Sequence, residues 1–313
     1  MPKKPSPARV AAPLATASAL ALTACAPAST EAGEDSALPV VLTTFTVLED
    51  MTAEVGGERV EVRSIAPAGA EIHDYDPTPS AVRGAAEADL VIENGLGLET
   101  WFDQFLQHAD APTVTATDGV DTMPVTRLPG HPDDPGSAAQ MPVNPHAWMS
   151  PVQAEVYVDN IEAALAEHFP DDAEYFAQNA DQYRQQLDQV HRTTVERFDA
   201  VDSPVHLVTC EGAFSYLAEE YGIGEHYLWS LNAEDEGTAA QTEAQIDYVA
   251  QHNVPMIFCE STVNDSAQQQ VAAESGSALG QPLYVDSLSD GGAVPTYIEL
   301  LEYDIDQILS AYE

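Results

Sequence analysis

The stretch DDAEYFAQNADQYRQQLDQVHRTTVERFDAV, residues 171–201, predicts a single long helix. Neither glycine nor proline interrupts it, so it can continue for about eight turns at 3.6 residues per turn. Its apolar residues are sparse and define one narrow buried face: Tyr175, Phe176, Tyr183, Leu187 and Val190. A long helix of this kind is typical of a strut that spans two lobes.

On both sides of this helix, short apolar segments alternate with amphipathic ones. Strands are predicted within residues 40–45, 58–67, 90–95, 205–210, 225–231, 255–261 and 282–288. Helices are predicted within residues 46–51, 80–90, 98–109, 150–169, 213–222, 242–253, 265–276 and 295–312, and a long surface loop within 113–143. This alternation predicts an α/β fold with two lobes, each a mostly parallel sheet with flanking helices, joined by the long helix.

The N-terminus has the pattern of a secretory signal. Lys3, Lys4 and Arg9 precede an apolar run at residues 11–24, which is too short for an ordinary membrane-spanning helix. The run ends in Leu-Thr-Ala-Cys at Cys25, which resembles the bacterial lipobox, whose cysteine is acylated and becomes the mature N-terminus. The alternative is an ordinary signal in which Cys25 is incidental.

These patterns divide the chain into five segments. They are a lipoprotein signal peptide at residues 1–24, a flexible tether at 25–38, an N-terminal lobe at 39–169, the spanning helix at 170–201 and a C-terminal lobe at 202–313. We therefore expect an extracytoplasmic protein that is lipid-anchored to the outer face of the cell membrane.

The chain is strongly acidic, with a formal net charge of −42. Both lysines precede residue 5, so the predicted mature chain has seven arginines and no lysine. Because the carboxylates are spread over the whole chain, adaptation to high salt explains most of this charge better than attraction of a particular cation. Such a surface excludes nucleic acid as a partner.

Two cysteines remain once Cys25 is assigned to lipid. An extracytoplasmic setting permits a disulfide between Cys210 and Cys259. Two buried thiols are an equal alternative, since the sequence does not give the distance between them.

Four ionisable residues stand at strand ends or in turns stiffened by proline. His73 and Glu211 follow predicted strands, Asp286 closes another, and His146 lies between Pro145 and Pro151. Singly, each has an ordinary structural explanation, because a histidine is commonly a surface or core residue and a carboxylate commonly begins a helix or closes a turn. Together, two imidazoles and two carboxylates, two from each lobe, predict a ligand site at the carboxyl ends of strands.

Seven stretches resemble, in order, the metal-receptor lipoproteins of bacterial ABC importers for manganese, zinc or iron. They are AEIHDYDPTPS, LVIENGLGLETWFDQF, NPHAWMSP, TCEGAFSYLAEEYGI, LNAEDEGTAAQ, CESTVNDSAQQQVAAESG and YVDSLS, and the resemblance extends from about residue 40 to the C-terminus. It implies a solute-binding protein with metal ligands His73, His146, Glu211 and Asp286, and an ABC permease as partner. We expect a monomer without enzymatic activity.

Manganese is the cargo that the sequence favours, with Fe²⁺ next. Zinc receptors of this family generally place histidine where this chain has Glu211, and often carry a His-rich loop where residues 128–145 hold only His131. Carboxylate oxygens suit Mn²⁺ better than Zn²⁺. A zinc receptor of the same fold stays an alternative, because such sites commonly bind zinc more tightly than manganese.

Two readings come from other classes of protein. A metal-dependent hydrolase would need an open coordination position and a general base, and the chain has no HExxH or nucleophile-elbow motif. A surface adhesin using the same fold is not distinguishable from a receptor by sequence.

If the acidic surface is an adaptation to salt, the melting temperature should fall as the salt concentration is lowered from molar to millimolar. Repulsion between carboxylates is then less screened. Thermal unfolding followed by circular dichroism measures this, and sodium and potassium chloride should act alike at equal ionic strength. An unchanged melting temperature would contradict the salt-adaptation hypothesis.

Overall fold

A parallel sheet of four strands forms the N-terminal part of the fold. The computed structural model describes residues 37–102, 111–126, 128, 142–231 and 237–312, of which Leu38 onward belong to one compact unit. The strands are β1 (Val40–Thr43), β2 (Glu61–Ser64), β3 (Leu90–Glu93) and β4 (Thr113–Thr115), in the order β2-β1-β3-β4. All pairs are parallel. The signal peptide, Cys25 and most of the predicted tether lie outside the described residues.

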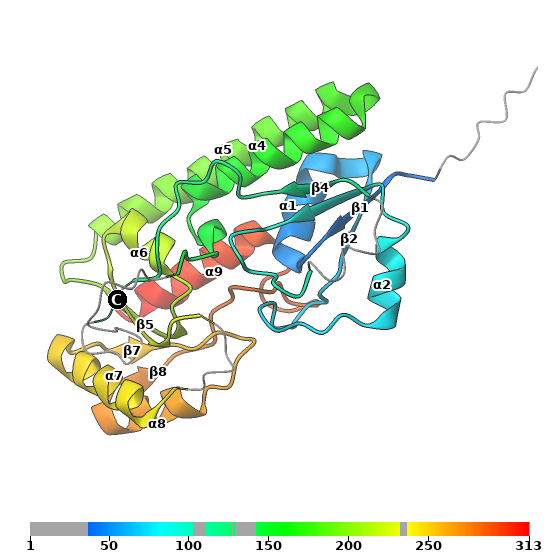
Figure 1. The fold of residues 1–313 in the computed structure, drawn as a ribbon. Coiled ribbons are helices and arrows are strands. Elements are labelled where there is room, and N and C mark those ends of the chain that lie inside the picture. The colour runs from blue at the N-terminus through cyan, green and yellow to red at the C-terminus, as the bar shows by residue number, and fades with distance from the viewer. Residues whose placement is uncertain (1–36, 103–110, 127, 129–141, 232–236, 313) are drawn as a thin grey trace, which may run out of the picture. The chain divides into compact units, whose positions relative to one another are not determined.

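Helices and short 3₁₀ turns connect these strands (Figure 1). They are α1 (Thr46–Gly56), η1 (Gly57–Arg59) and α2 (Pro79–Ala85). Helix α2 begins with Pro79, and the Thr78 hydroxyl accepts a hydrogen bond from the amide of Ala81. The second proline after His73 therefore starts a helix as well as stiffening the turn.

One strand was missed within the predicted surface loop. Residues Thr113–Thr115 form β4 and pair with β3 at the edge of the sheet. Three residues with only one apolar side chain carry too little periodicity to be recognised, so the prediction of a loop throughout residues 113–143 was wrong at its start. The predicted helix at residues 98–109 falls largely outside the described residues.

Two short parallel pairs form the C-terminal part. Strands β5 (His206–Glu211) and β6 (Gly224–Trp229) are one pair, and β7 (Met256–Ile257) and β8 (Ala278–Leu279) are the other. The helices between them are α6 (Ser215–Tyr221), α7 (Ala239–His252) and α8 (Ser266–Ser275). The amide of Phe258 donates to the carbonyl of Val208 at 2.8 Å and so connects the two pairs.

The predicted last strand at residues 282–288 is not a strand. Only Leu283 forms a bridge, with Glu260. Beyond it, backbone groups bond to side chains instead of to a neighbouring strand: the amide of Tyr284 donates to Asp304, and the amide of Leu288 to the Thr46 hydroxyl. The apolar alternation of this segment reflects burial, not membership of a sheet.

The predicted long helix is α5 (Ala173–Asp199), preceded by a 3₁₀ turn η3 (Pro170–Asp172). It lies beside α4 (Pro151–His168) and contacts α1 and α9 (Tyr297–Ser310) (Figure 1). Its buried face contains Phe176, Ala180, Tyr183, Leu187, Val190 and Thr194, as the narrow apolar pattern predicts. The fold is thus the α/β class predicted, with a helix pair in place of a lone strut.

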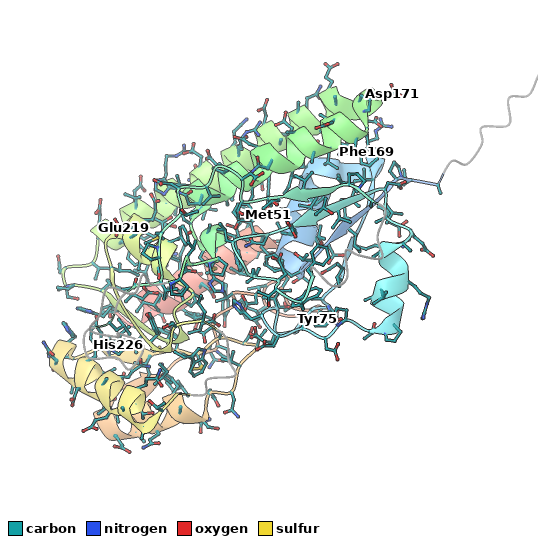
Figure 2. All side chains as sticks on the ribbon, in the orientation of Figure 1. Met51, Tyr75, Phe169, Asp171, Glu219 and His226 are labelled. Carbon is teal, nitrogen blue, oxygen red and sulfur yellow. A yellow bond between two sulfur atoms is a disulfide. The ribbon has the colours of Figure 1, made fainter. Side chains whose placement is uncertain are left out.

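A continuous apolar core connects the two parts. One buried cluster includes Phe45, Met51, Trp148, Leu187, Leu207 and Leu301, contributed by segments from both sides of α5. Figure 2 shows Met51 in the interior, whereas Asp171 projects from one end of the helix pair. Because packed cores resist deformation, this continuity favours small local motions over a wide opening of the fold. The boundaries proposed for two lobes within this unit stay a prediction.

Among the described residues, none of the helices combines the length and apolar character needed to cross a membrane.

Truncation of the α5 core face should destabilise the protein. Leu187 is fully buried, and Leu187→Ala should lower the free energy of unfolding by about 2–5 kcal/mol, because it removes buried apolar surface and leaves a cavity. Val195 lies on the same helix but is 37% exposed, so Val195→Ala should change the free energy of unfolding by less than about 0.5 kcal/mol. Urea unfolding of both variants measures the difference, and equal effects would contradict the assigned face.

Candidate metal centre

The four predicted ligand residues lie together in the structure. The Nε2 atoms of His73 and His146 are 3.1 Å apart, and Glu211 Oε1 lies 3.1 Å from the first and 3.7 Å from the second. Asp286 Oδ1 is 3.5 Å from His146 Nε2. One donor atom from each residue lies within 4.8 Å of all the others, and all four side chains are buried.

Contacts within and around its turn hold His73 in place. Its amide donates to Glu71 Oε1 at 2.9 Å, and the Trp101 indole donates to the carbonyl of Ile72 at 2.7 Å. The Tyr75 hydroxyl donates to the carbonyl of Ile65, at the end of β2. The backbone of the turn that carries the imidazole is therefore held by hydrogen bonds on both sides of His73.

Asn144 orients His146. Its Oδ1 accepts hydrogen bonds from the His146 amide at 3.0 Å and from the ring Nδ1 at 2.8 Å. An amide oxygen can only accept, so Nδ1 carries a proton, and Nε2 is the ring nitrogen that faces the cluster. The Asn144 amide group also donates to the carbonyl of Gly212, next to Glu211, at 2.8 Å. One side chain thus connects the segments that carry two of the four predicted ligands.

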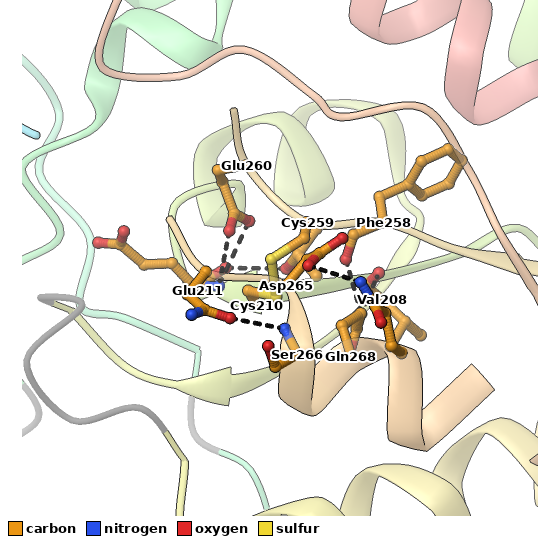
Figure 3. The surroundings of a disulfide bond; sticks show 12 residues. Val208, Cys210, Glu211, Phe258, Cys259, Glu260, Asp265, Ser266 and Gln268 are labelled. Carbon is orange, nitrogen blue, oxygen red and sulfur yellow. Dashed lines mark hydrogen bonds between the residues drawn. A yellow bond between two sulfur atoms is a disulfide. The ribbon is translucent and has the colours of Figure 1, made fainter. Parts of the chain in front are cut away.

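Glu211 is the last residue of β5 and lies beside a disulfide. Cys210 and Cys259 are bonded in the structure, so neither sulfur is a thiolate that could bind an ion. Figure 3 shows Glu260, the residue after Cys259, reaching the amide of Glu211, which donates to both carboxylate oxygens at 3.3 Å. The backbone of Glu211 is therefore held by a residue of the segment that follows β7.

The segment that carries Asp286 is bonded to the N-terminal part of the fold. The Trp148 indole donates to the carbonyl of Val285 at 3.1 Å. On the other side, the Ser287 hydroxyl accepts from the amide of Gly69 at 2.6 Å, and the amide of Leu288 donates to the Thr46 hydroxyl at 2.8 Å. These contacts replace the sheet pairing that the sequence predicts for this segment.

The electrostatics of the cluster are those of crowded carboxylates. Burial alone lowers the pKa of His73, but Glu211, Asp286 and Glu71 raise it to about 10. Burial raises the pKa of Glu71, and the charges of Asp286 and Glu211 raise it further, to about 8. Burial also raises the pKa of Glu260 well above its usual value.

Within the described residues, the carboxylates of this cluster outnumber its positive charges, and His73 lies 3.1 Å from Glu211. The chain has no lysine after Lys4, and the arginine ion pairs that these residues form lie elsewhere. A divalent cation placed among the four predicted ligands would offset the remaining negative charge. Two nitrogens and two carboxylates are a donor set suited to a divalent transition metal ion.

Sequence reasoning did not assign three residues next to this cluster: Glu71, Asn144 and Glu260. Glu71 and Asn144 each stand two residues before a histidine and accept a hydrogen bond from its amide. Such a short polar residue two positions ahead is a local pattern that could have been noticed. Glu260 has no such pattern, because it is distant from Glu211 in sequence and reaches it only through tertiary packing.

Comparison with known proteins places the chain in a family. Residues 41–311 match the family described as zinc-uptake complex component A, periplasmic, or ZnuA. The chain belongs to this family.

Named relatives and solved structures agree with that membership. The chain is 40% identical to the iron-binding protein YfeA of Yersinia pestis, over 87% of this chain and 86% of YfeA. It is 30% identical to the manganese-binding lipoprotein MntA of Halalkalibacterium halodurans, over 93% and 94% of the two chains. A manganese-bound periplasmic metal-binding protein from Candidatus Liberibacter asiaticus has the same fold, with a TM-score of 0.78 and 32% identity over 88% of this chain and 100% of that one. These similar proteins are named for different metals, so the comparisons leave the ion open.

The polar network behind His146 should make stability depend on pH. The Asn144 amide donates to the Ser215 hydroxyl, which donates to the carboxylate of Glu225. Burial raises the pKa of Glu225 to about 7, although hydrogen bonds from Thr126, Ser215 and Phe214 oppose the rise. The folded protein then binds more protons than the unfolded chain between pH 4.5, the ordinary value, and about 7, so its stability falls as the pH rises through this window.

Glu225→Gln should flatten that dependence and raise the free energy of unfolding above pH 7 by about 1–3 kcal/mol. Urea unfolding of the chelator-treated protein at fixed salt, from pH 4.5 to 8, measures it. The exposed Glu219 on α6 provides the control variant Glu219→Gln, for which we expect the wild-type profile. Parallel profiles for wild type and Glu225→Gln would contradict the argument.

Proposed function

We propose that this protein is an extracytoplasmic solute-binding protein that captures one divalent transition metal ion and delivers it to an ABC permease. The observation that carries the proposal is the convergence of His73, His146, Glu211 and Asp286, buried donors from four separate segments, within 4.8 Å. The metal is the transported substrate, and the proposal includes no catalytic step.

Manganese is the proposed cargo, and Fe²⁺ is the next choice. The carboxylate of Glu211 supports this order, because hard oxygen donors suit Mn²⁺ and Fe²⁺ better than a nitrogen- or sulfur-rich site would. The relatives named for iron and for manganese support it as well. The zinc description of the family keeps a zinc receptor as the alternative.

The proposal extends to how the protein is held at the membrane. Acylation at Cys25 would anchor a monomer to the outer face of the cell membrane, and residues 25–38 would serve as the tether. The relative MntA is named a lipoprotein, which supports this assignment. Residues 39–169 and 202–313 would act as the two lobes between which the ion is held.

Protein purified without chelator from the membranes of its own cells should contain about one equivalent of manganese or iron by elemental mass spectrometry. His73→Ala removes one buried nitrogen donor and should abolish this content. His168 lies at the C-terminal end of α4, away from the predicted ligands, so His168→Ala should retain the metal.

The outcomes separate the parts of the proposal. One equivalent of zinc, lost in His73→Ala, would retain the receptor and overturn the choice of ion. Absence of metal from the wild type, or equal metal in wild type and His73→Ala, would contradict the proposed site.

A further inference from the structure

The stretch that follows β5 is bonded to the segment that carries His146 through one residue, Asn144. The side-chain amide of Asn144 donates to the carbonyl of Gly212 at 2.8 Å and to the Ser215 hydroxyl oxygen at 3.1 Å. Its backbone carbonyl accepts a hydrogen bond from the Tyr216 hydroxyl at 2.9 Å. Three residues beyond the end of β5 therefore bond the residue that stands two positions before His146.

The groups at each end of the Asn144 side chain fix its orientation. Its Oδ1 accepts from the amide and the ring Nδ1 of His146, at 3.0 Å and 2.8 Å. A backbone amide can only donate, so this end of the side chain is the oxygen, and the NH₂ group faces Gly212 and Ser215. Both hydrogens of that group are used, one for each acceptor. Because Asn144 is fully buried, loss of either acceptor would leave a buried donor unpaired.

Ser215 can accept from Asn144 because its own proton has another partner. A hydroxyl has one hydrogen and two lone pairs. The Asn144 side chain and the amide of Thr126, at 3.3 Å, donate to Ser215 Oγ, whereas Glu225 Oε2 lies 2.9 Å from it and can accept. The carboxylate of Glu225 therefore takes the Ser215 proton and leaves the lone pairs of the hydroxyl for its two donors.

The hydrogen bonds from His146 to Glu225 all run in the same direction. His146 Nδ1 donates to Asn144, Asn144 donates to Ser215, and Ser215 donates to Glu225. All four side chains are buried. Hydrogen bonds aligned in this way in a low-dielectric interior polarise and strengthen one another, so a change at the Glu225 end acts on the contact with the imidazole.

An ordinary role at the helix terminus does not account for the Ser215 hydroxyl. Helix α6 begins at Ser215, but its N-cap position is Phe214 and no side chain there caps the helix. The hydroxyl instead contacts Asn144, Thr126 and Glu225, which lie in other parts of the chain. Its contacts join separate segments behind a predicted ligand.

We propose that Ser215 is a positioning residue for the metal site: oriented by Glu225, it holds the Asn144 amide so that His146 keeps its Nε2 directed at the other donors. This inference rests on the proposed function. It adds two residues that are not ligands and that act through Asn144. Partners that orient the histidine ligands of a metal commonly change its affinity by about 10–100-fold.

Four variants separate the hydrogen bond from charge and from general stability. Ser215→Ala removes the acceptor for the Asn144 amide. Glu225→Met and Glu225→Gln both remove the charge on an unbranched side chain, but only the amide retains an oxygen that readily accepts the Ser215 proton. The control is Thr194→Val, which removes another buried hydroxyl that donates to the carbonyl of Val190 at 2.8 Å within α5.

Competition titrations of the chelator-stripped proteins with Mn²⁺ and with Zn²⁺ test the proposal. For Ser215→Ala and for Glu225→Met we expect the affinity for both ions to fall by about tenfold or more, because His146 is a ligand for either ion. Glu225→Gln and Thr194→Val should stay within about threefold of the wild type. The Glu225 pair keeps the test decisive if Ser215→Ala does not fold.

Nuclear magnetic resonance of metal-free protein with ¹⁵N-labelled histidine reports the positioning itself. The Nδ1 proton of His146, assigned by its absence in His146→Ala, is buried and bonded to Asn144 and should exchange slowly with water in the wild type. Its exchange should be faster in Ser215→Ala and in Glu225→Met, and unchanged in Thr194→Val. A role in stability alone would not produce this difference.

The outcomes distinguish this inference from the proposed function. Affinities of Ser215→Ala within about threefold of the wild type would overturn the role of Ser215, as would equal losses in Glu225→Met and Glu225→Gln or in Ser215→Ala and Thr194→Val. If the wild type binds metal and His73→Ala does not, such results leave the proposed function in place. A wild type that binds neither ion would remove both.

Discussion

The burial of several acidic side chains in one place is the constraint on which the centre of this structure depends. Glu211, Glu260 and Asp286 are almost completely buried, Glu71 contributes a buried oxygen, and the neighbouring positive charge available from the described residues is that of protonated imidazole. Such a group of carboxylates is stable only if protons or a cation compensate it. Protons and a metal ion therefore compete for the same place, and the apparent affinity for metal must depend on pH.

The surrounding structure holds these groups together despite their repulsion. The apolar core includes residues that precede α5 and residues that follow it. Hydrogen bonds with Trp101, Asn144 and Trp148 fix the segments that carry the histidines and Asp286. The disulfide of Cys210 and Cys259 joins the two segments on which Glu211 and Glu260 lie. Folding thus supplies the free energy that keeps the donor atoms close when no ion is bound.

The sequence allowed the prediction of what local pattern determines. The alternation of strands and helices gave the α/β class, and the uninterrupted run at residues 171–201 gave α5. His73, His146, Glu211 and Asp286 could be selected because strand ends and prolines mark positions with defined backbone geometry. The roles of Glu71, Asn144 and Glu260 could not be predicted in this way, since each depends on a partner that tertiary packing supplies. The same holds for residues 284–288, whose backbone bonds to side chains of Asp304 and Thr46 that are distant in sequence.

The attachment of the Asp286 segment has a kinetic consequence. Three hydrogen bonds, to Trp148, Gly69 and Thr46, hold the residues on both sides of Asp286 against the N-terminal part of the fold. Since the core opposes a wide opening, release of an ion held by Asp286 would require this local attachment to loosen, and the strength of these bonds would then contribute to the residence time of the ion. A transport partner that offers competing contacts to this one segment would shorten that residence time without having to separate the rest of the molecule.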